Sequence, residues 1–600
     1  MNPRWWSQPF HPDGSVTSDG MVKQLGMPEL DPLTVMLRET AQNSWDARRD
    51  EDEPIRIRYS IGTLGNRAAS WRQLLLPFDT VDPHVTTLSH HLRPESHYLL
   101  VSDRGTVGLG GPVRSDVDGQ PRDFVDFVRN SGQRRDHELG GGTYGFGKGS
   151  LFRISRPGVI LIDTVCIDGG RPQRRLIGSA LGLSHERDGR RYTGRHWWGN
   201  IRDDVPDPLL EDEADVAAEL LGLELRNDGP GTDIWILGVN LGENDDGTPR
   251  TALQAAEVLA ASAAWYLWPK LIDRPARGPV IDIEVDVEGV PVAVPNPASE
   301  PRLLPFVEAL RKIDAGEGAR HTRRTAPTHL GDFALHKELW FQPEPSALDS
   351  CAPFSGRAHH CARMRPVELV VDYFPGPEPA DPNLQYGAVY RASVEANNYF
   401  ADAEPPTHHD WITTHLTGTS KGVVTGARRY IAQQMNEAVR DNTSRGQATT
   451  APLGQLSRAL ARILPLASGD GADHPEPRPG GGGGRRSGRV IKTIGRPTVR
   501  VRDGVAYVAQ QVRVEPSSDP VTAVGEAQVA VDGGTEREAP TGAETPTIHG
   551  WEPAHGGELR LGPELTIGPA DPRDWILLAV PARDTATVVR VREKDRGGAS

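Results

Sequence analysis

The sequence predicts an α+β protein of several domains, and its length and two kinds of pattern support this prediction. The 600 residues are enough for roughly three or four domains. Helix patterns and strand patterns both occur before residue 466, whereas residues 467–490 are rich in glycine and proline and predict a flexible linker. Strand patterns follow the linker, so we expect a small β domain at residues 491–600.

The first strong helix signal begins at Asp31-Pro32. Aspartate is a favoured N-cap residue and proline suits the first helical position, so a helix should start here. Further along, Glu39, Asn43 and Asp46 stand at positions i, i+4 and i+7, which share one face of a helix. An amide oxygen suits magnesium beside phosphate oxygens, and a nearby carboxylate can orient and deprotonate an attacking water. The helix therefore carries residue types that suit a magnesium-nucleotide site.

Two glycine-rich segments follow this helix. In the first, a strand ends at Asp103 and continues into a turn that contains Gly105, Gly108 and Gly110. The second is a longer run whose bare backbone amides can close over phosphates. Its candidate phosphate-lid residues are Gly142, Thr143, Tyr144, Gly145, Phe146, Gly147 and Lys148. Taken alone, the Glu-Asn-Asp stripe is typical of a solvated helix face and each glycine cluster is typical of a turn, so the order of the three segments is the informative feature.

In this order, the segments resemble the nucleotide site of the GHKL ATPases, which include DNA gyrase, MutL proteins, heat-shock chaperones, histidine kinases and MORC proteins. The family's helix pattern E-x3-N-x2-D-A is matched by Glu39, Asn43, Asp46 and Ala47. The resemblance implies that Glu39 is the general base and that Asn43 is the magnesium ligand. It also implies a GHKL (Bergerat) α/β sandwich that binds ATP and Mg²⁺ and hydrolyses ATP.

The resemblance also assigns the remaining nucleotide contacts. Asp103 would accept the adenine amino group, and residues 142–148 would lie over the phosphates. Residues 229–238 predict a turn followed by a strand, and Thr232 corresponds to the family's threonine beside the adenine-binding aspartate. The family's D-x-G-x-G is one residue longer here, so the partner of Gly105 is either Gly108 or Gly110.

A P-loop is the alternative interpretation of the second glycine segment. Residues 142–150 imitate the pattern G-x4-G-K-[ST], shifted by one residue at the end. A P-loop would need a strand immediately before it and would leave the helix of Glu39 without a role, so the GHKL assignment is preferred.

Residues 246–466 predict a second, α/β domain. Together with the region just before it, the expected elements are helices at residues 208–221, 252–271 and 424–440 and strands at residues 280–287, 367–374 and 386–394. A β-rich segment that closes with a helix resembles the transducer domain of gyrase and MutL. That resemblance implies a catalytic lysine that reaches the γ-phosphate from a loop before the helix, and Lys421 occupies such a place.

Basic residues cluster around the end of the linker. They are Arg485, Arg486, Arg489, Lys492, Arg496, Arg500 and Arg502. A cluster of this kind predicts contact with DNA phosphates, although it is equally typical of a solvated strand face.

Composition restricts the class of protein further. A net charge of −14 disfavours unspecific nucleic-acid binding by the whole surface. The chain has no apolar run long enough for a membrane span and no apolar signal core at its start, so we expect a cytoplasmic protein. Three cysteines exclude a disulfide scaffold. Cys351 and Cys361 lie near two histidines but lack zinc-knuckle spacing, so we expect a loop with incidental cysteines and leave metal binding open.

The N-terminal arm carries Trp5 and Trp6, and two interpretations of it stay open. In dimerising GHKL ATPases such an arm crosses to the partner subunit when ATP binds. Packing against the protein's own body is equally consistent with two adjacent tryptophans.

The resemblance implies an ATP-driven conformational switch with an arm and ATPase domain at residues 1–245, a transducer-like domain at 246–466, a linker at 467–490 and a β-rich domain at 491–600. This layout is closest to bacterial MutL/MORC-like ATPases of restriction or phage-defence systems. It implies an ATP-dependent homodimer that acts with DNA and with a partner nuclease, helicase or methyltransferase. The alternative is a chaperone-like ATPase that acts on protein clients. An interaction protein with a degenerate nucleotide site also stays open, because the glycine spacing is altered.

Overall fold

A computed structural model describes most of the chain. The described residues are 3–18, 30–50, 52–76, 87–130, 148–223, 229–274, 278, 280–340, 342–343, 346–405, 409–444, 491–502, 505–515, 520–531, 534–536, 545–581 and 587–594. They divide into two compact units, Met1–Asn442 and Thr443–Ser600. No helix among these residues is long and apolar enough to cross a membrane.

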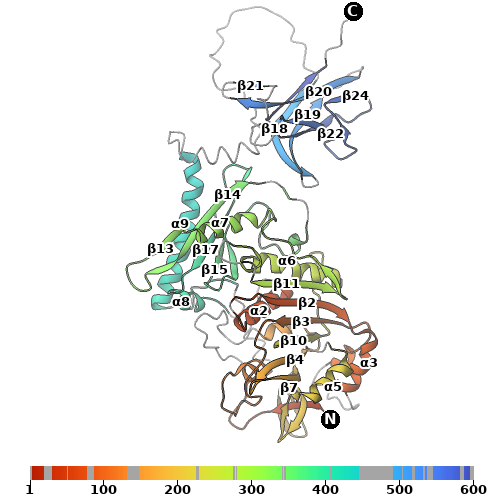
Figure 1. Cartoon of the computed structure of the whole chain (residues 1–600), viewed down its shortest axis with the longest axis vertical. Coiled ribbons are helices and arrows are strands. Elements are labelled where there is room, and N and C mark those ends of the chain that lie inside the picture. The colour runs from red at the N-terminus through yellow and green to blue at the C-terminus, as the bar shows by residue number, and fades with distance from the viewer. Residues whose placement is uncertain are drawn as a thin grey trace, which may run out of the picture. The chain divides into compact units, whose positions relative to one another are not determined.

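The first unit begins with a large mixed sheet (Figure 1). Its main path contains β1 (Arg4–Pro9), β7 (Arg190–Arg202), β5 (Arg171–Leu181), β4 (Val159–Asp168), β10 (Gly231–Leu237), β3 (His97–Arg104), β2 (Ile55–Thr63), β11 (Ile281–Val287) and β12 (Val290–Val292), in that spatial order. Three short strands, β6 (His185–Arg187), β8 (Val205–Asp207) and β9 (Leu209–Leu210), pair outside this path. β11 runs parallel to β2, whereas the other neighbours on the path are antiparallel.

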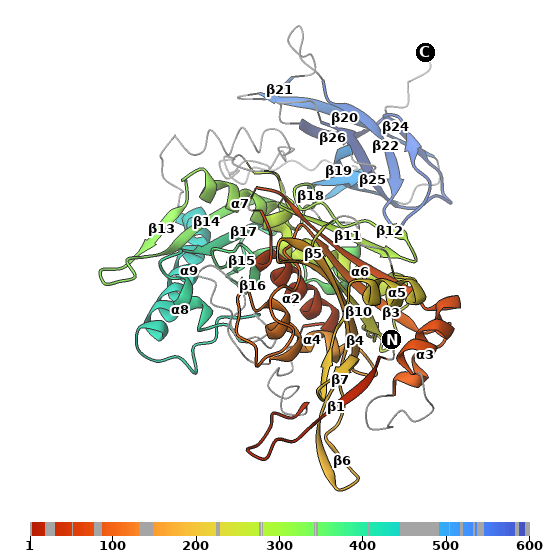
Figure 2. The ribbon, with the colours of Figure 1, turned by 60° about the horizontal axis from the view of Figure 1, so that its bottom comes forward.

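The central strands of this sheet are buried on both faces. In β3, Leu99 and Val101 enter one hydrophobic core, and Tyr98 and Leu100 enter the other. This alternation is the two-residue period of a strand, with both faces apolar because helices cover both. The helices α2 (Pro32–Asp46), α4 (Gly149–Arg153) and α6 (Ala252–Leu271) cover the first face, and α3 (Ala68–Leu75) and α5 (Asp212–Leu221) cover the second (Figure 2).

The sequence explains where α2 begins. Asp31 is its N-cap, and one carboxylate oxygen accepts a hydrogen bond from the backbone nitrogen of Leu33 at 2.8 Å. The other oxygen lies 2.6 Å from Nη1 of the buried Arg250, just before α6. The cap therefore also ties the start of α2 to the approach of α6.

The second part of this unit, which we call the second lobe, is built on a five-stranded sheet. Its strands, in spatial order, are β13 (Ala319–Thr322), β14 (His329–Leu339), β17 (Leu384–Ala392), β15 (His359–Met364) and β16 (Val370–Pro375). One face packs on α7 (Leu304–Asp314) and on the C-terminal half of α6, whereas the other packs on α8 (Asn397–Ala401) and α9 (Gly418–Ser444). Since α6 enters the cores of both sheets, it connects the first sheet to the second lobe.

The second unit consists of strands in the residues that the structure describes. One sheet contains β18 (Ile491–Arg502), β19 (Val505–Val514), β25 (Asp574–Val580), β22 (Thr547–Pro553) and β23 (Arg560–Leu561). The other contains β21 (Gly534–Glu536), β20 (Val521–Val531), β24 (Glu564–Ile567) and β26 (Thr587–Glu593). Both sheets contribute to one apolar core, which includes the buried Trp551 and Trp575.

Several expected elements are confirmed, and others differ in their bounds. α2 begins as expected, and α6 begins and ends as expected. The helix expected at 208–221 begins at Asp212, because β9 occupies the residues before it. The strand expected at 280–287 is β11, which joins the first sheet. Strands on both sides of residue 245, where the sequence suggested a domain boundary, therefore share one sheet. The linker at 467–490 lies outside the described residues.

The N-terminal arm packs on the body of the same chain. β1 is the edge strand of the first sheet and pairs with β7, where Trp5 lies opposite Trp198 and Trp6 opposite Trp197. The indole nitrogen of Trp5 donates to the carbonyl of Leu75 at 3.0 Å. In this structure the arm therefore packs against the protein's own body, which is one of the two interpretations of its tryptophans.

The cap of α2 yields a stability prediction. Replacing Asp31 with alanine removes the acceptor for the Leu33 nitrogen and leaves the buried Arg250 without this carboxylate, so we expect a loss of about 1–3 kcal/mol. Asp31→Asn is the matched control, because it keeps a capping oxygen and removes only the charge. Urea unfolding checks both variants, and equal losses in the two would mean that the cap itself contributes nothing.

Candidate nucleotide site

A hollow of about 570 Å³ lies between α2, the end of β3 and β10. It is lined by Thr40, Asn43, Ser44, Ala47, Val101, Asp103, Thr106, Gly108, Leu109, Asp123, Phe127, Leu151, Thr232 and Ile234. Four predicted site residues from distant parts of the sequence thus meet here: Asn43, Asp103, Gly108 and Thr232. We call this hollow the first pocket.

Asp103 is held by donors from three different segments. Its Oδ1 accepts hydrogen bonds from the hydroxyl of Thr106 at 2.5 Å and from the backbone nitrogen of Thr232 at 2.9 Å. Its Oδ2 accepts one from the hydroxyl of Ser44 on α2 at 3.1 Å. An ionised carboxylate is an acceptor only, so these donors stabilise the charged form and fix its orientation. The side chain therefore presents acceptor oxygens at the pocket.

Two threonines support this arrangement from the neighbouring strands. The hydroxyl of Thr164 on β4 donates to the carbonyl of Gly231 and accepts from the backbone nitrogen of Leu109, both at 3.0 Å. It also lies 3.1 Å from the hydroxyl of Thr232. Thr232 thus lies beside Asp103 as expected, but its backbone nitrogen makes the contact, and its hydroxyl reaches Thr164.

The turn after β3 contains the glycines whose spacing departs from the family pattern. Gly105 and Gly108 both have positive φ values, of 81° and 69°. A Cβ atom on Gly108 would lie 2.0 Å from the carbonyl oxygen of Val165, whereas one on Gly110 would approach nothing closer than 3.4 Å. Gly108 also lines the first pocket. Of the two alternatives, the geometry therefore favours Gly108 as the partner of Gly105.

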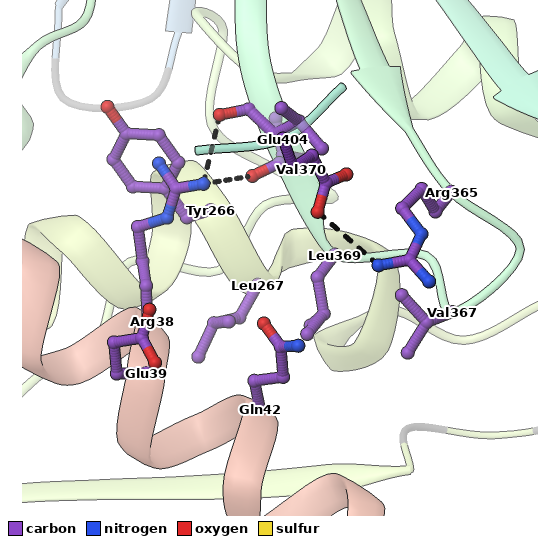
Figure 3. A pocket seen from close by; sticks show the side chains of 11 residues that line it. Arg38, Glu39, Gln42, Tyr266, Leu267, Arg365, Val367, Leu369, Val370 and Glu404 are labelled. Carbon is purple, nitrogen blue, oxygen red and sulfur yellow. Dashed lines mark hydrogen bonds and ion pairs between the residues drawn. The ribbon is translucent and has the colours of Figure 1, made fainter. Parts of the chain in front are cut away.

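Glu39 lies one turn before Asn43 on α2 but lines a different hollow, which we call the second pocket. This pocket has a volume of about 410 Å³ and is bounded by α2, α6 and the second lobe (Figure 3). Its lining residues are Arg38, Glu39, Gln42, Tyr266, Leu267, Arg365, Val367, Leu369, Val370, Val371 and Glu404. Glu39 is buried, with 7% of its surface exposed. Asp46, the third residue of the predicted helix pattern, lines neither pocket.

The predicted phosphate lid falls mostly outside the described residues, which resume at Lys148. Its ammonium group donates hydrogen bonds to the backbone carbonyls of Asp126, Phe127 and Asn130. These carbonyls belong to the turn of η3 (Val125–Arg129) and the residue after it. The exposed carbonyls of a helix end attract a cation, so Lys148 fixes this segment against the start of α4.

Lys421 does not lie where the sequence placed it. The expectation of a loop is wrong, because α9 begins at Gly418 and Lys421 stands in its first turn. Its side chain is exposed, and it lines neither pocket. Two other residues of the second lobe face Glu39 across the second pocket: Arg365 and Glu404, with Nη1 and Oε2 3.3 Å apart.

Sequence reasoning missed most of the other residues around the first pocket. They include Ser44, Thr106, Asp123 and Phe127 in its lining and Thr164 beside it. Ser44 and Thr106 stand next to predicted site residues, so their hydroxyls were a detectable signal. Thr164 lies on β4, 55 residues after its partner Leu109, and only the pairing of the strands brings the two together.

The described residues contain no group of three or more histidine, cysteine, aspartate or glutamate side chains that could hold a metal ion. The two cysteines near the histidines lie in different elements, Cys351 in η4 (Ala347–Cys351) and Cys361 in β15, so the expectation of a single loop is wrong. Burial raises the pKa of the Cys351 thiol to about 11.

The chain was compared with known proteins. No family model and no curated protein matches it. The ATPase region of Saccharomyces cerevisiae topoisomerase II is 8% identical and has a TM-score of 0.27, with 68% of this chain and 85% of that chain covered. The ATPase and transducer domains of DNA topoisomerase II from Balamuthia mandrillaris are 9% identical with a TM-score of 0.26, and 73% and 92% of the chains are covered. These TM-scores are too low to assign a function to this chain, so any functional assignment depends on the candidate site itself.

The glycine turn yields a second prediction. Gly108→Ala should destabilise the protein by about 1–3 kcal/mol from backbone conformation alone, and by more from the approach to the Val165 carbonyl. Gly110→Ala is the control in the same turn, because a Cβ atom fits there. Chemical unfolding of both variants is the measurement, and a Gly108 variant as stable as the Gly110 variant would contradict the geometry.

Proposed function

We propose that this chain is an ATP-binding and ATP-hydrolysing conformational switch with a GHKL-type ATPase site. The observation that carries the proposal is the carboxylate of Asp103, oriented by Ser44, Thr106 and Thr232 at the wall of a pocket that Asn43 also lines. An acceptor held in this way is what an adenine amino group needs. The mixed α/β fold, with the candidate helix packed on a large sheet, is consistent with this class.

The residues of the first pocket fit a nucleotide in chemistry as well as in place. Val101, Leu109 and Ile234 supply an apolar surface for a base, and Asp103 supplies its polar contact. Asn43 lies on the same wall one turn before Ala47, and its amide oxygen is a suitable ligand for Mg²⁺ beside phosphate oxygens. When bound, Mg²⁺ would neutralise charge that develops on the phosphates.

Glu39 is the proposed general base. It stands one helical turn from Asn43, so a nucleotide whose phosphates extend along α2 would bring its terminal phosphate near the carboxylate. A buried carboxylate at that end can accept a proton from an attacking water. Hydrolysis would then remove the terminal phosphate, and with it any contacts that this phosphate makes across the second pocket.

The wider form of the proposal is an ATP-driven dimer clamp of the MutL/MORC-like kind, acting with DNA and a partner nuclease, helicase or methyltransferase in a defence system. Its support is the order of the parts along the chain. In the described C-terminal strands, Lys492 pairs with Glu515, and Arg500 and Arg502 both reach Glu552. These pairs give three residues of the basic cluster a partner within the same domain. Arg485, Arg486 and Arg489 of the cluster lie outside the described residues.

Adenine recognition is tested by Asp103→Asn. The amide places a donor where three protein donors and the adenine amino group need an acceptor, so affinity for a non-hydrolysable ATP analogue should fall roughly tenfold or more. Isothermal titration measures it, with Asp118→Asn as the control because Asp118 is exposed and outside the pocket. Wild-type affinity in the Asp103 variant would place the adenine elsewhere.

The chemical step is tested by Glu39→Gln. Loss of the base should lower turnover roughly a hundredfold or more while nucleotide affinity is nearly unchanged. Asn43→Ala should act differently, with weaker magnesium-dependent binding. Steady-state ATPase rates and titrations with and without magnesium separate the two effects. Normal hydrolysis by the Glu39 variant would remove this residue from the mechanism.

A further inference from the structure

Arg38, the residue before Glu39, is buried where α2 meets the second lobe. Its Nη2 donates hydrogen bonds to the backbone carbonyls of Val370 at 3.1 Å and Val371 at 2.9 Å, at the start of β16 (Figure 3). Its guanidinium carbon lies 4.4 Å from the ring centre of Tyr266 on α6. The side chain therefore connects three elements at the turn of α2 that carries Glu39.

Burying the charged guanidinium costs free energy, and its hydrogen bonds have a defined direction. Burial lowers the pKa of the Arg38 guanidinium, while the negative charge of Glu39 acts in the opposite direction. Both hydrogen bonds come from Nη2, whose two N–H bonds have fixed directions in the plane of the guanidinium, so they constrain the orientation of the group relative to the two successive carbonyls. The acceptors are backbone atoms, so their positions depend on where the strand β16 lies and not on its side chains.

The two pockets are lined by different parts of the chain. Every described residue that lines the first pocket belongs to the region between Thr40 and Ile234. The second pocket, which contains Glu39, is closed by Val370, Glu404 and other residues of the second lobe. The proposed adenine contacts and the proposed base thus line two different pockets along α2, and only the pocket of the base is bordered by the second lobe.

From this geometry we propose that Arg38 is a positioning residue for Glu39, which makes hydrolysis depend on the packing of β16 against α2. The inference rests on the proposed function, in which Glu39 is the base. It adds that the second lobe acts on the chemical step through Arg38, while nucleotide binding is set by the first pocket alone.

The test compares Arg38→Met and Arg38→Lys in the full chain. Methionine keeps much of the length and removes all donors, so turnover should fall about tenfold or more from misplacement of the base, with analogue affinity nearly unchanged. Lysine keeps the charge and one carbonyl bond, so it should recover part of the lost turnover. Arg174→Met is the control, because it breaks a buried pair with Asp163 on β4, away from α2.

ATPase rates, analogue affinity and thermal midpoints are measured for each variant. Wild-type turnover in Arg38→Met would overturn the inference, as would equal losses of turnover in Arg38→Met and Arg174→Met at equal loss of stability. If Arg38→Met does not fold, Arg38→Lys decides, because wild-type turnover in it together with a lower thermal midpoint indicates a structural role only. A wild-type protein that neither binds nor hydrolyses ATP would overturn the proposed function and this inference with it. A wild-type enzyme that hydrolyses ATP alongside an active Arg38→Met variant overturns this inference alone.

Discussion

The candidate site depends on how the carboxylate of Asp103 is held. Its three donors come from α2, from the turn after β3 and from β10. The bond from Thr106 is local, whereas Ser44 and Thr232 come from distant parts of the chain and reach Asp103 only in the folded protein. The hydrogen bonds from Ser44 and Thr232 therefore form only when β3 and β10 pair in the observed register and α2 lies in the observed place. The hydrogen-bond donors around the carboxylate offset the free-energy cost of burying part of it. The same donors hold it in one orientation. A shift of α2 would remove the Ser44 bond, so the helix and the pocket wall move together.

The burial of both sheet faces explains why so many polar groups of α2 are inside the protein. α2 packs on the sheet along one side and on α6 along another, so its remaining surface faces two pockets and little solvent. Each buried polar group then needs a defined partner. Thr40 meets the hydroxyl of Tyr59 at 2.9 Å, Ser44 meets Asp103, and Arg38 meets the carbonyls of β16. Substitutions on this helix are consequently felt as changes of position as well as of chemistry.

Local signals in the sequence predicted the local parts of the structure. The Asp31-Pro32 cap marks the start of α2, and the helix begins where this signal stands. The helix expected at residues 252–271 likewise matches the bounds of α6. Features set by long-range pairing were not predictable in the same way. β11 pairs with β2, more than 200 residues earlier, and no local pattern shows that it completes the first sheet. The choice between Gly108 and Gly110 depends on the carbonyl of Val165, which only the fold brings near. Lys421 was expected in a loop because the helix was expected to begin at residue 424, whereas α9 begins at Gly418.

In the proposed function, the position of α2 between two pockets lets one helix serve binding and hydrolysis separately. Thr40, Asn43 and Ser44 line the first pocket, whereas Arg38, Glu39 and Gln42 line the second. A rotation or translation of α2 would change both sides together, because a helix moves as a rigid body. Movement of the second lobe, in contrast, would alter only the Glu39 side, where Val370 and Val371 hold Arg38. If Glu39 is the base, as we propose, the interface between α2 and β16 is the place where a conformational change in the second lobe would alter the rate of hydrolysis without changing nucleotide affinity.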